Sequence, residues 1–403
     1  MTKDLFEKSE RYLNILCREI EERCVGSSGN LMATHFLEKE FSRLGWDTRK
    51  TEFEAIDWED NGAILRADDI FFDVLVSPYS LPFTGEASLE TATTLKELEK
   101  LNLKDKLILL SGDLAREQLM PKNFVFYNPE EHQKIIALLE KGEPKAIICA
   151  TGRNAALAGG VYPFPLIEDG DFNIPSVYMT EEEGKKLGQY VGRNIFLESR
   201  SRRIPGKGFN ILATKGKTNV RRIVITAHID AKKGTPGAID NASGIVVLLL
   251  LAGLLSDYKG DKLIELVALN GEDYYAVPGQ MNYIMSNHGR FNEMLLNINI
   301  DGAGYKEGPS ALSLFDLPDG LHTLVNEVIG KYDGLTEGIQ WPQGDHSIFL
   351  QYGVPAIAVS SKWFIDNING QDITHTPKDN LEIVDSMKLI EISNALNDLI
   401  RRI

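Results

Sequence analysis

Residues 222–244 read R-I-V-I-T-A-H-I-D-A-K-K-G-T-P-G-A-I-D-N-A-S-G and decide the fold. The β-branched run 223–226 predicts a buried parallel strand, because both faces of such a strand are apolar. The strand leads into His228 and Asp230, whose side chains point the same way if the strand persists that far. A Gly/Pro-rich loop, Asp240 and an apolar run over 245–255 follow. The stretch predicts a strand, a loop and a buried helix, with polar side chains where the strand ends.

These polar side chains have two interpretations. Imidazole and carboxylate groups at the carboxyl end of a parallel strand suit Zn²⁺ or a similar metal. A His-x-Asp at a strand end can equally be a satisfied polar pair, and Asp240 can cap the helix that follows it. The stretch alone leaves both interpretations open.

Length and charge limit the fold and the partners. At 403 residues the chain exceeds one usual hydrophobic core, so two domains are expected. The formal net charge of −15 argues against a nucleic-acid backbone or an anionic membrane as the partner. No feature of the sequence indicates an oligomeric state.

The three cysteines and the first residues of the chain bear on its location. Cys17 and Cys24 lie ~10 Å apart along the axis of a helix expected over 3–24, which is too far for a disulfide. The total of three cysteines is odd and shows no disulfide pattern, which favours a reducing compartment. Residues 1–12 are charged throughout and carry no apolar signal segment, and no apolar run reaches the ~18 residues of a membrane span. We expect a cytoplasmic protein without a membrane span, unless a leader has been removed.

Strands and helices are expected to alternate after residue 203. The pattern predicts strands at 208–214, 223–228, 263–270, 296–300, 311–315 and 356–360, with helices at 242–256, 278–287, 320–332, 345–352 and 384–402. This alternation predicts an α/β domain with a mostly parallel central sheet between layers of helices. Two N-terminal helices and a strand at 46–56 lack a core of their own, so they are assigned to this domain. The predicted domain is therefore discontinuous, with residues 1–62 and 206–403, and residues 63–205 form an inserted, smaller, β-rich α/β domain.

Several expected strands end in ionisable residues. The strand over 223–228 runs into His228, the next into 271–273 (G-E-D), and the third into Asp301; His375 lies in a loop before the last helix. Each one alone also fits a turn, a solvated corner or a capped loop. Ligands in such sheets bind outside the carboxyl ends of the strands, however. Together with Asp240, these residues predict one metal site at that edge.

The set resembles the family of co-catalytic zinc exopeptidases that includes aminopeptidase Y, the secreted bacterial leucyl aminopeptidases and glutamate carboxypeptidase II. The family motifs H-x-D, D-N-x-S-G, G-E-[ED], a strand-end Asp and H-T-x-x-D match 228–230, 240–244, 271–273, Asp301 and 375–379. The resemblance covers 208–403 and extends to 1–60. The inserted domain resembles the protease-associated domain that several members carry at this place.

The resemblance implies two Zn²⁺ ions, or other divalent metals, held by His228, Asp240, Asp273, Asp301 and His375. Asp240 would bridge the two ions. Glu272 would be the general base that moves a proton from water to the leaving amine. Asp230 would support catalysis by orienting His228, and Asp379 by orienting His375.

Two positions depart from the family pattern. Asp273 is the shorter of the two carboxylates that the family allows there. Thr374 stands where many members have a tyrosine that stabilises the oxyanion, and losing such a donor can cost ~3–4 kcal/mol of barrier. Tyr274, Tyr275 and His346 are the candidates to replace it.

The resemblance predicts a zinc-dependent metallopeptidase, specifically an aminopeptidase that acts on peptides. One alternative is a non-catalytic peptidase-like binding protein. Another is a glutaminyl cyclase-like acyltransferase, a single-zinc enzyme. The presence of both sides of the metal pair and of Glu272 weighs against both alternatives. The sequence indicates neither the preferred side chain nor, decisively, which end of the peptide is attacked.

Overall fold

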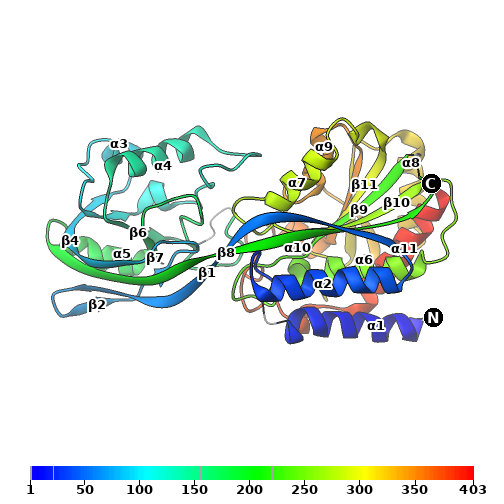
Figure 1. Ribbon diagram of the computed structural model, residues 1–403, viewed down its shortest axis with the longest axis horizontal. Helices are drawn as coiled ribbons and strands as arrows, with labels where there is room; N and C mark the ends of the chain where they lie inside the picture. Colours follow the sequence, from blue (N-terminus) through cyan, green and yellow to red (C-terminus); the bar gives the residue numbers. More distant parts are fainter. Residues whose placement is uncertain (1, 21, 154–156, 219–220) are drawn as a thin grey trace. The chain divides into compact units, whose positions relative to one another are not determined.

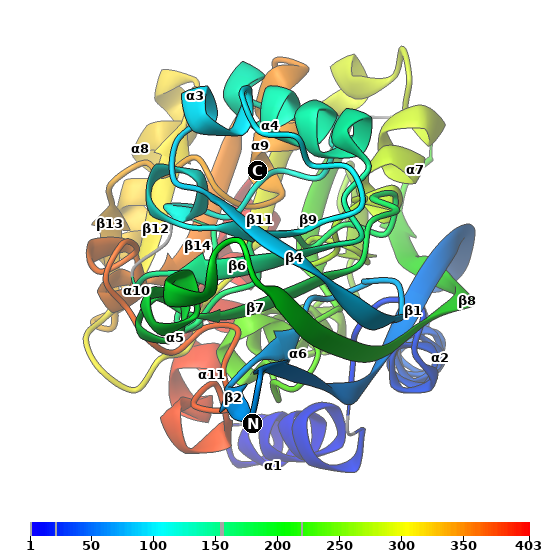
Figure 2. The ribbon, with the colours of Figure 1, turned by 90° about the vertical axis from the view of Figure 1, so that its left-hand side faces the viewer.

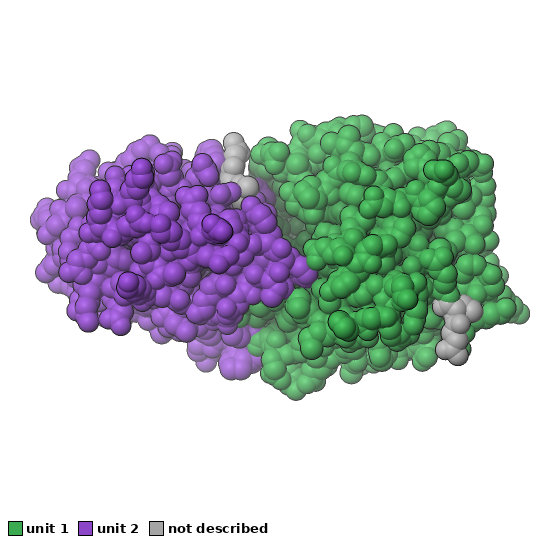
Figure 3. All heavy atoms as spheres, turned by 90° about the horizontal axis from the view of Figure 1, so that it is seen from above, with its two compact units in different colours: residues 1–55, 207–403 green, residues 56–206 purple. Residues whose placement is uncertain are grey.

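The computed structural model describes residues 2–20, 22–153, 157–218 and 221–403, and the chain divides into two compact units. Unit 1 consists of Met1–Ala55 and Lys207–Ile403, and unit 2 of Ile56–Gly206 (Figure 3). The sequence placed the boundaries at 62–63 and 205–206. Both observed boundaries fall inside long strands, β1 (Asp47–Ala67) and β8 (Asn194–Gly216). The composition does not change where a continuous strand passes from one unit into the other. The first boundary therefore differs by seven residues from the predicted one.

The central sheet of unit 1 has the strand order β13-β12-β14-β11-β9-β10-β8. Its further strands are β9 (Arg222–His228), β10 (Leu263–Leu269), β11 (Met294–Ile300), β12 (Ser310–Phe315), β13 (Leu335–Gly338) and β14 (Ala356–Ser361). β9 pairs in parallel with both β10 and β11, and the pairs β11–β14 and β12–β13 are parallel too. Only β8–β10 and β12–β14 among these neighbours run antiparallel. The predicted mostly parallel α/β sheet is confirmed.

Helices cover both faces of this sheet (Figure 1). One layer contains α1 (Thr2–Asn14), α2 (Ser28–Arg43), α6 (Ser243–Leu254) and α11 (Ser386–Arg402), and the other contains α7 (Pro278–Ser286) and α9 (His346–Gln351). α8 (Asp319–Ile329) packs against α11 and β13. The residues of α6 from Ser243 to Ala252 are all buried, which is typical of a helix that is apolar on every side. α1 and α11 pack on α6, so α6 is an inner helix.

Short helical segments complete unit 1: η1 (Ile15–Glu19), η4 (Ala238–Ala242), η5 (Phe291–Glu293), α10 (Lys362–Asp366) and η6 (Leu381–Ile383). The helix expected over 3–24 thus ends at Glu19, and Cys24 lies beyond it. All three cysteines are free thiols. In the part of the chain that the structure describes, no helix is both long enough and apolar enough to cross a membrane.

Unit 2 contains the strand order β8-β4-β5-β6-β7-β3, and β2 pairs with β1. Its elements are β2 (Ile70–Phe72), β3 (Leu75–Val76), β4 (Phe83–Ala92), α3 (Leu95–Leu98), β5 (Leu107–Leu110), η2 (Gly112–Ala115), α4 (Glu130–Gly142), β6 (Ala146–Thr151), β7 (Ser176–Thr180), α5 (Glu181–Leu187) and η3 (Gly188–Tyr190). Figure 2 shows α4 and α5 on opposite sides of its strands. Ile108 and Leu110 belong to one apolar cluster, and Leu107 and Leu109 to another. This alternation along β5 gives unit 2 a core on each face of its sheet.

Candidate metal centre

Neighbouring strands place the predicted ligands at one edge of the unit 1 sheet. β9 ends at His228, and β11 ends one residue before Asp301. β10 ends at Leu269, four residues before Asp273. The three strands lie in the order β11-β9-β10 and are parallel, so their carboxyl ends meet at the same edge. The spacing of the motifs along the chain thus becomes proximity in space.

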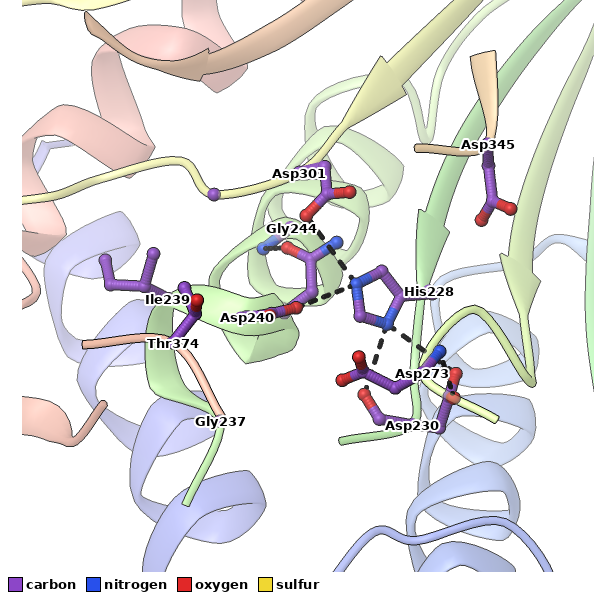
Figure 4. A network of polar contacts seen from close by, with 12 residues as sticks. His228, Asp230, Gly237, Ile239, Asp240, Gly244, Asp273, Asp301, Asp345 and Thr374 are labelled. Carbon is purple, nitrogen blue, oxygen red and sulfur yellow. Dashed lines mark hydrogen bonds and ion pairs between the residues drawn. The ribbon is translucent and has the colours of Figure 1, made fainter. Parts of the chain in front are cut away.

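Two groups of ligand atoms share Asp240. His228 Nε2 lies 3.0 Å from Asp240 Oδ1 and 3.6 Å from Asp301 Oδ1. His375 Nε2 lies 3.2 Å from Asp240 Oδ2 and 3.0 Å from Asp273 Oδ1. Figure 4 shows the side chains of Asp240 and Asp301 directed toward His228. The structure therefore brings together all five residues that the sequence named as ligands, with one oxygen of Asp240 on each side.

The donor set fits divalent metal ions. Two imidazole nitrogens and three carboxylates are ligand types that Zn²⁺ accepts. Within the described residues, His228 Nε2 and Asp273 Oδ2 are buried atoms that make no hydrogen bond. The 3.0 Å approach of Asp240 to His228 Nε2 is thus an ion-pair distance without hydrogen-bond geometry. Buried polar atoms left in this way are costly unless another partner satisfies them, and a cation satisfies both.

The charges of the cluster oppose one another. Burial lowers the pKa of His228, but Asp230, Asp240 and Asp301 outweigh it and raise that pKa well above its ordinary value. His375 behaves alike: burial lowers its pKa, and Asp273 with Asp240 raises it well above the ordinary value. The neighbouring carboxylates therefore favour the protonated form of both histidines in the absence of a cation. A metal ion would displace these protons, because its ligands must be deprotonated.

Asp230 supports the ligands through the backbone. It is fully buried, its Oδ1 accepts a hydrogen bond from Gly271 N–H (2.8 Å), and its Oδ2 accepts one from Asp273 N–H (3.0 Å). Its Oδ1 also lies 3.6 Å from His228 Nδ1, and its carbonyl oxygen lies 3.2 Å from the same nitrogen. Asp230 thus connects the end of β9 to the loop after β10, which is a wider role than orienting His228.

Asp379 contacts the segment that carries Asp240. Its Oδ1 accepts from Ile239 N–H (2.6 Å) and its Oδ2 from Asp240 N–H (3.0 Å). Burial, aided by the charge of Asp240, raises the pKa of Asp379 to about 7. The sequence assigned Asp379 to the orientation of His375. The hydrogen bonds that the structure shows for its carboxylate instead fix the backbone before the bridging residue.

The D-N-A-S-G motif has a packing reason. Asn241 Nδ2 donates to the carbonyl oxygen of Ile300 (2.9 Å), and its Oδ1 accepts from Gly244 N–H (3.1 Å). A Cβ at Gly244 would lie 2.4 Å from Asn241 Oδ1 and 2.6 Å from Ile300 O, so only glycine fits there. This contact connects η4, which carries Asp240, to the end of β11, which immediately precedes Asp301.

Glu272 is partly exposed beside the buried Asp273. Burial raises its pKa well above the ordinary value, and the charges of Asp301, Asp273 and Asp345 add to this effect against His228. Asp345 precedes α9 and accepts a hydrogen bond from Gln280 Nε2 (3.0 Å). Asp345 is the nearby carboxylate to which the sequence gave no role.

The candidates for the oxyanion donor differ in their surroundings. Thr374 is partly exposed, and its Oγ1 accepts a hydrogen bond from Gln371 Nε2 (2.5 Å). Tyr274 and Tyr275 are buried and contact each other, with ring centroids 4.6 Å apart. His346 is fully buried, and its Nε2 lies 3.0 Å from the carbonyl oxygen of Trp341. This burial fits a structural hydrogen bond for His346, and Thr374 is the more accessible donor.

Comparison with known proteins identifies relatives. Residues 210–400 match the model of Peptidase family M28. The chain is similar to aminopeptidase YwaD of Bacillus subtilis, with 25% identity over 280 residues. That match covers 63% of this chain and 59% of YwaD, so it spans less than two thirds of the relative's length.

Solved structures share the fold over nearly the whole chain. A zinc aminopeptidase from Bacillus subtilis superposes with a TM-score of 0.76 at 19% identity, covering 98% of this chain and 95% of the other. An aminopeptidase from Aneurinibacillus sp. strain AM-1 gives 0.74 at 20% identity, covering 98% and 93%. At this level of identity the similarity establishes the fold of the chain.

Proposed function

We propose that this protein, whose residues 210–400 match the model of Peptidase family M28, is a zinc-dependent aminopeptidase, which removes N-terminal residues from peptides. One observation carries the proposal: two histidines and three carboxylates converge at a single sheet edge, with Asp240 shared between two groups of ligand atoms. The similarity to aminopeptidases supports it.

The shared position of Asp240 supports two metal ions per chain. His228 and Asp301 would complete one site, and Asp273 and His375 the other. Divalent cations bound there would lower the pKa of water and polarise the scissile carbonyl. The fit of the donors, and not a measured occupancy, supports the count of two.

Glu272 is the residue to which we assign proton transfer. It is adjacent to the proposed ligand Asp273 and is not fully buried as a residue, which is compatible with contact to the attacking water and the leaving amine. It would accept a proton from the water and deliver it to the amine nitrogen. Asp230 and Asp379 would hold the backbone of Asp273 and Asp240 in place during this step.

The carboxylates around the proposed metal centre favour binding of the amino end of a peptide. A free α-ammonium group is attracted to carboxylates, and Asp301 and Asp345 lie close enough to Glu272 to raise its pKa. A peptide carboxylate would be repelled by the same groups unless the metals outweigh them. This argument favours an aminopeptidase over a carboxypeptidase.

Two alternatives are weaker. A non-catalytic binding protein has no need of a complete set of clustered carboxylates with little exposure to solvent, which are costly to keep. A glutaminyl cyclase needs a single zinc, whereas donors are present here on both sides of Asp240. It is also disfavoured by Thr374, because the cyclase resemblance calls for a tryptophan before the last histidine.

We further propose that residues 56–206 act as a protease-associated domain and that the protein works in the cytoplasm. The separate cores of unit 2 support the first point. Three free cysteines support the second, because thiols persist in reducing compartments. Truncated and full-length chains compared on long and short peptides test the first, and cell fractionation tests the second.

The decisive experiment combines metal analysis with a substrate panel. Zinc-loaded protein is assayed on aminoacyl-nitroanilides, on the same peptides with acetylated amino ends, and on peptides that begin with glutamine. We expect two metals per chain and hydrolysis only of substrates with a free amino end. Cleavage of the acetylated peptides would contradict the amino-end assignment, and cyclisation of the glutamine peptides without hydrolysis would favour the cyclase.

A further inference from the structure

A buried arginine contacts the loop that joins two of the proposed metal ligands, His228 and Asp240. Arg23 belongs to the segment between η1 and α2, and its side chain is 2% exposed. Burying a guanidinium is unfavourable unless its N–H groups are hydrogen-bonded. The partners of Arg23 therefore show what its burial achieves.

Four backbone carbonyl oxygens accept hydrogen bonds from this guanidinium, which also lies near the side chains of Cys17 and Asp379. Nε donates to Ile229 O (3.0 Å), and Nη2 donates to Gly237 O (2.7 Å). Nη1 donates to Pro236 O (2.8 Å) and to Leu16 O (2.6 Å). Three of the four carbonyls belong to the loop between β9 and η4, and they lie more than 200 residues from Arg23 in the sequence.

The positions of these carbonyls connect Arg23 to the ligands. Ile229 directly follows His228, and Gly237 precedes Asp240 by three residues. One planar, rigid group therefore holds both ends of the loop that separates the two ligands. Their side chains lie 3.0 Å apart, from His228 Nε2 to Asp240 Oδ1. A change in the loop's ends would move Asp240 relative to His228.

Gly237 shows how close this contact is. Its φ of +58° favours glycine, and an added Cβ would lie 2.8 Å from Arg23 Nη2 and 2.6 Å from Asp240 O. The backbone at Gly237 is thus in contact with the guanidinium and with the bridging residue at once. A side chain there would disturb both.

The same segment reaches the loop after β10. Arg23 O accepts hydrogen bonds from Ala231 N–H (3.4 Å) and from Asn30 Nδ2 (2.8 Å). Asn30 and Asn270 exchange two amide hydrogen bonds, each of 2.9 Å. Asn270 stands two residues before Glu272. The segment from Arg23 to Asn30 therefore contacts both loops that carry the site.

We propose that Arg23 is a positioning residue of the metal centre, which sets the separation of Asp240 from His228 through the backbone carbonyls of Ile229, Pro236 and Gly237. The proposal rests on the metal centre of the proposed function. A purely structural arginine, by contrast, would stabilise the fold without affecting metal binding. Metal affinity separates these two roles.

Arg222 provides a matched control. It is a second buried arginine of unit 1, 6% exposed, whose guanidinium bonds Glu265 Oε2 (2.8 Å) and Asn287 Oδ1 (2.5 Å). It stands at the first residue of β9, at the opposite end of that strand from His228. Removing it should destabilise the fold and leave the metal ligands in place.

The experiment measures Zn²⁺ affinity and thermal stability for Arg23→Ala and Arg222→Ala. Affinity is measured by competition with a chromophoric chelator, and stability as the Tm of the metal-free proteins. We expect Arg23→Ala to bind Zn²⁺ ~10–100-fold more weakly, as is typical when groups that orient ligands are removed. Arg222→Ala should lower the Tm with less than a threefold change in affinity. Added guanidinium ion should restore affinity to Arg23→Ala alone.

Equal Zn²⁺ affinity of Arg23→Ala and wild type, or an equal loss in both arginine variants, would overturn the proposal. If Arg23→Ala does not fold, Gly237→Ala replaces it, because it keeps the arginine and displaces its contact. Gly237→Ala should then weaken Zn²⁺ binding ~10-fold or more, and unchanged affinity would overturn the proposal. Wild-type protein that binds no Zn²⁺ at all would instead contradict the proposed function, so the two failures are distinguishable.

Discussion

The carboxylate of Asp379 holds the backbone N–H of Asp240 at 3.0 Å, although 139 residues separate the two in the sequence. Its other oxygen holds the preceding N–H, of Ile239. The backbone of the proposed bridging residue, Asp240, is thus held by Asp379. This carboxylate belongs to the H-T-x-x-D motif, which also contains the proposed ligand His375. The two motifs depend on each other through this contact.

Asp379→Asn should weaken metal binding without removing a ligand. Asparagine can accept from one N–H with its oxygen, but its amide nitrogen would face the second N–H as another donor. We expect Zn²⁺ affinity to fall ~10–100-fold, the range usual for groups that support ligands. Isothermal titration of metal-free protein measures this. Asp372→Asn, which changes an exposed carboxylate nearby, serves as the control. Wild-type affinity in Asp379→Asn would contradict the dependence.

Asp240→Asn should empty both metal positions, since Asp240 is the ligand common to both groups. Asp301→Asn should affect mainly the group that contains His228. Elemental analysis of the two variants after dialysis is the measurement. We expect far less than one metal per chain for Asp240→Asn and close to one for Asp301→Asn. The same metal content in both variants would argue against a shared ligand.

Glu272→Gln should abolish turnover and leave metal binding nearly intact. Glutamine keeps the size of the side chain but cannot accept a proton, so the rate should fall by ~10²–10⁴ or more. Steady-state kinetics on an aminoacyl-nitroanilide, together with the metal content, checks both parts. If Glu272→Gln keeps most of its rate while Asp273→Asn loses it, the two adjacent residues have exchanged roles. Retained activity in both variants would move the active site elsewhere.

The metal-free protein should lose stability as the pH rises. Burial raises the pKa of Asp345 and of Asp379 to about 7 from 3.8, so their stabilisation is complete below pH 3.8 and is lost by about pH 7. The raised pKa values of His228 and His375 continue the loss above pH 6.5. Zn²⁺ should reverse the trend, because its ligands bind it deprotonated. Thermal melts at pH 5, 7 and 9, with and without Zn²⁺, measure this. A metal-free protein that is most stable at pH 9 would contradict it.

Local patterns predicted the elements that hold the ligands. The apolar run before His228 became β9, whose residues are all buried, and the apolar run after Asp240 became the inner helix α6. Both are short-range signals, since burial on every side requires apolar residues at every position. The placement of the ligands at strand ends followed from the parallel order of those strands. That order placed the candidate residues at one edge, and the resemblance to the zinc exopeptidases selected the five ligands among them.

Long-range partners could not be predicted in this way. Arg23 stands in a charged stretch, E-I-E-E-R-C, where an arginine suggests a solvated surface. Its burial depends on carbonyls of Ile229 and Gly237, and carbonyl positions leave no mark in a sequence. The contacts of Asp379 with Ile239 and Asp240 could not be predicted for the same reason, because these partners are backbone N–H groups. The strand β1 was underestimated because its pairing with β8 extends it past the first domain boundary.

The burial of α6 has a consequence for how the chain is made. Its apolar surface, G-I-V-V-L-L-L-L-A-G-L-L, packs against α11, which is synthesised well after it. About 130 residues must be added after α6 before α11 exists, which takes roughly 7–26 s at typical synthesis rates of about 5–20 residues per second. During that interval α6 exposes a face that is prone to aggregation. Nascent chains stalled between these two helices should therefore be the species that chaperones bind most strongly.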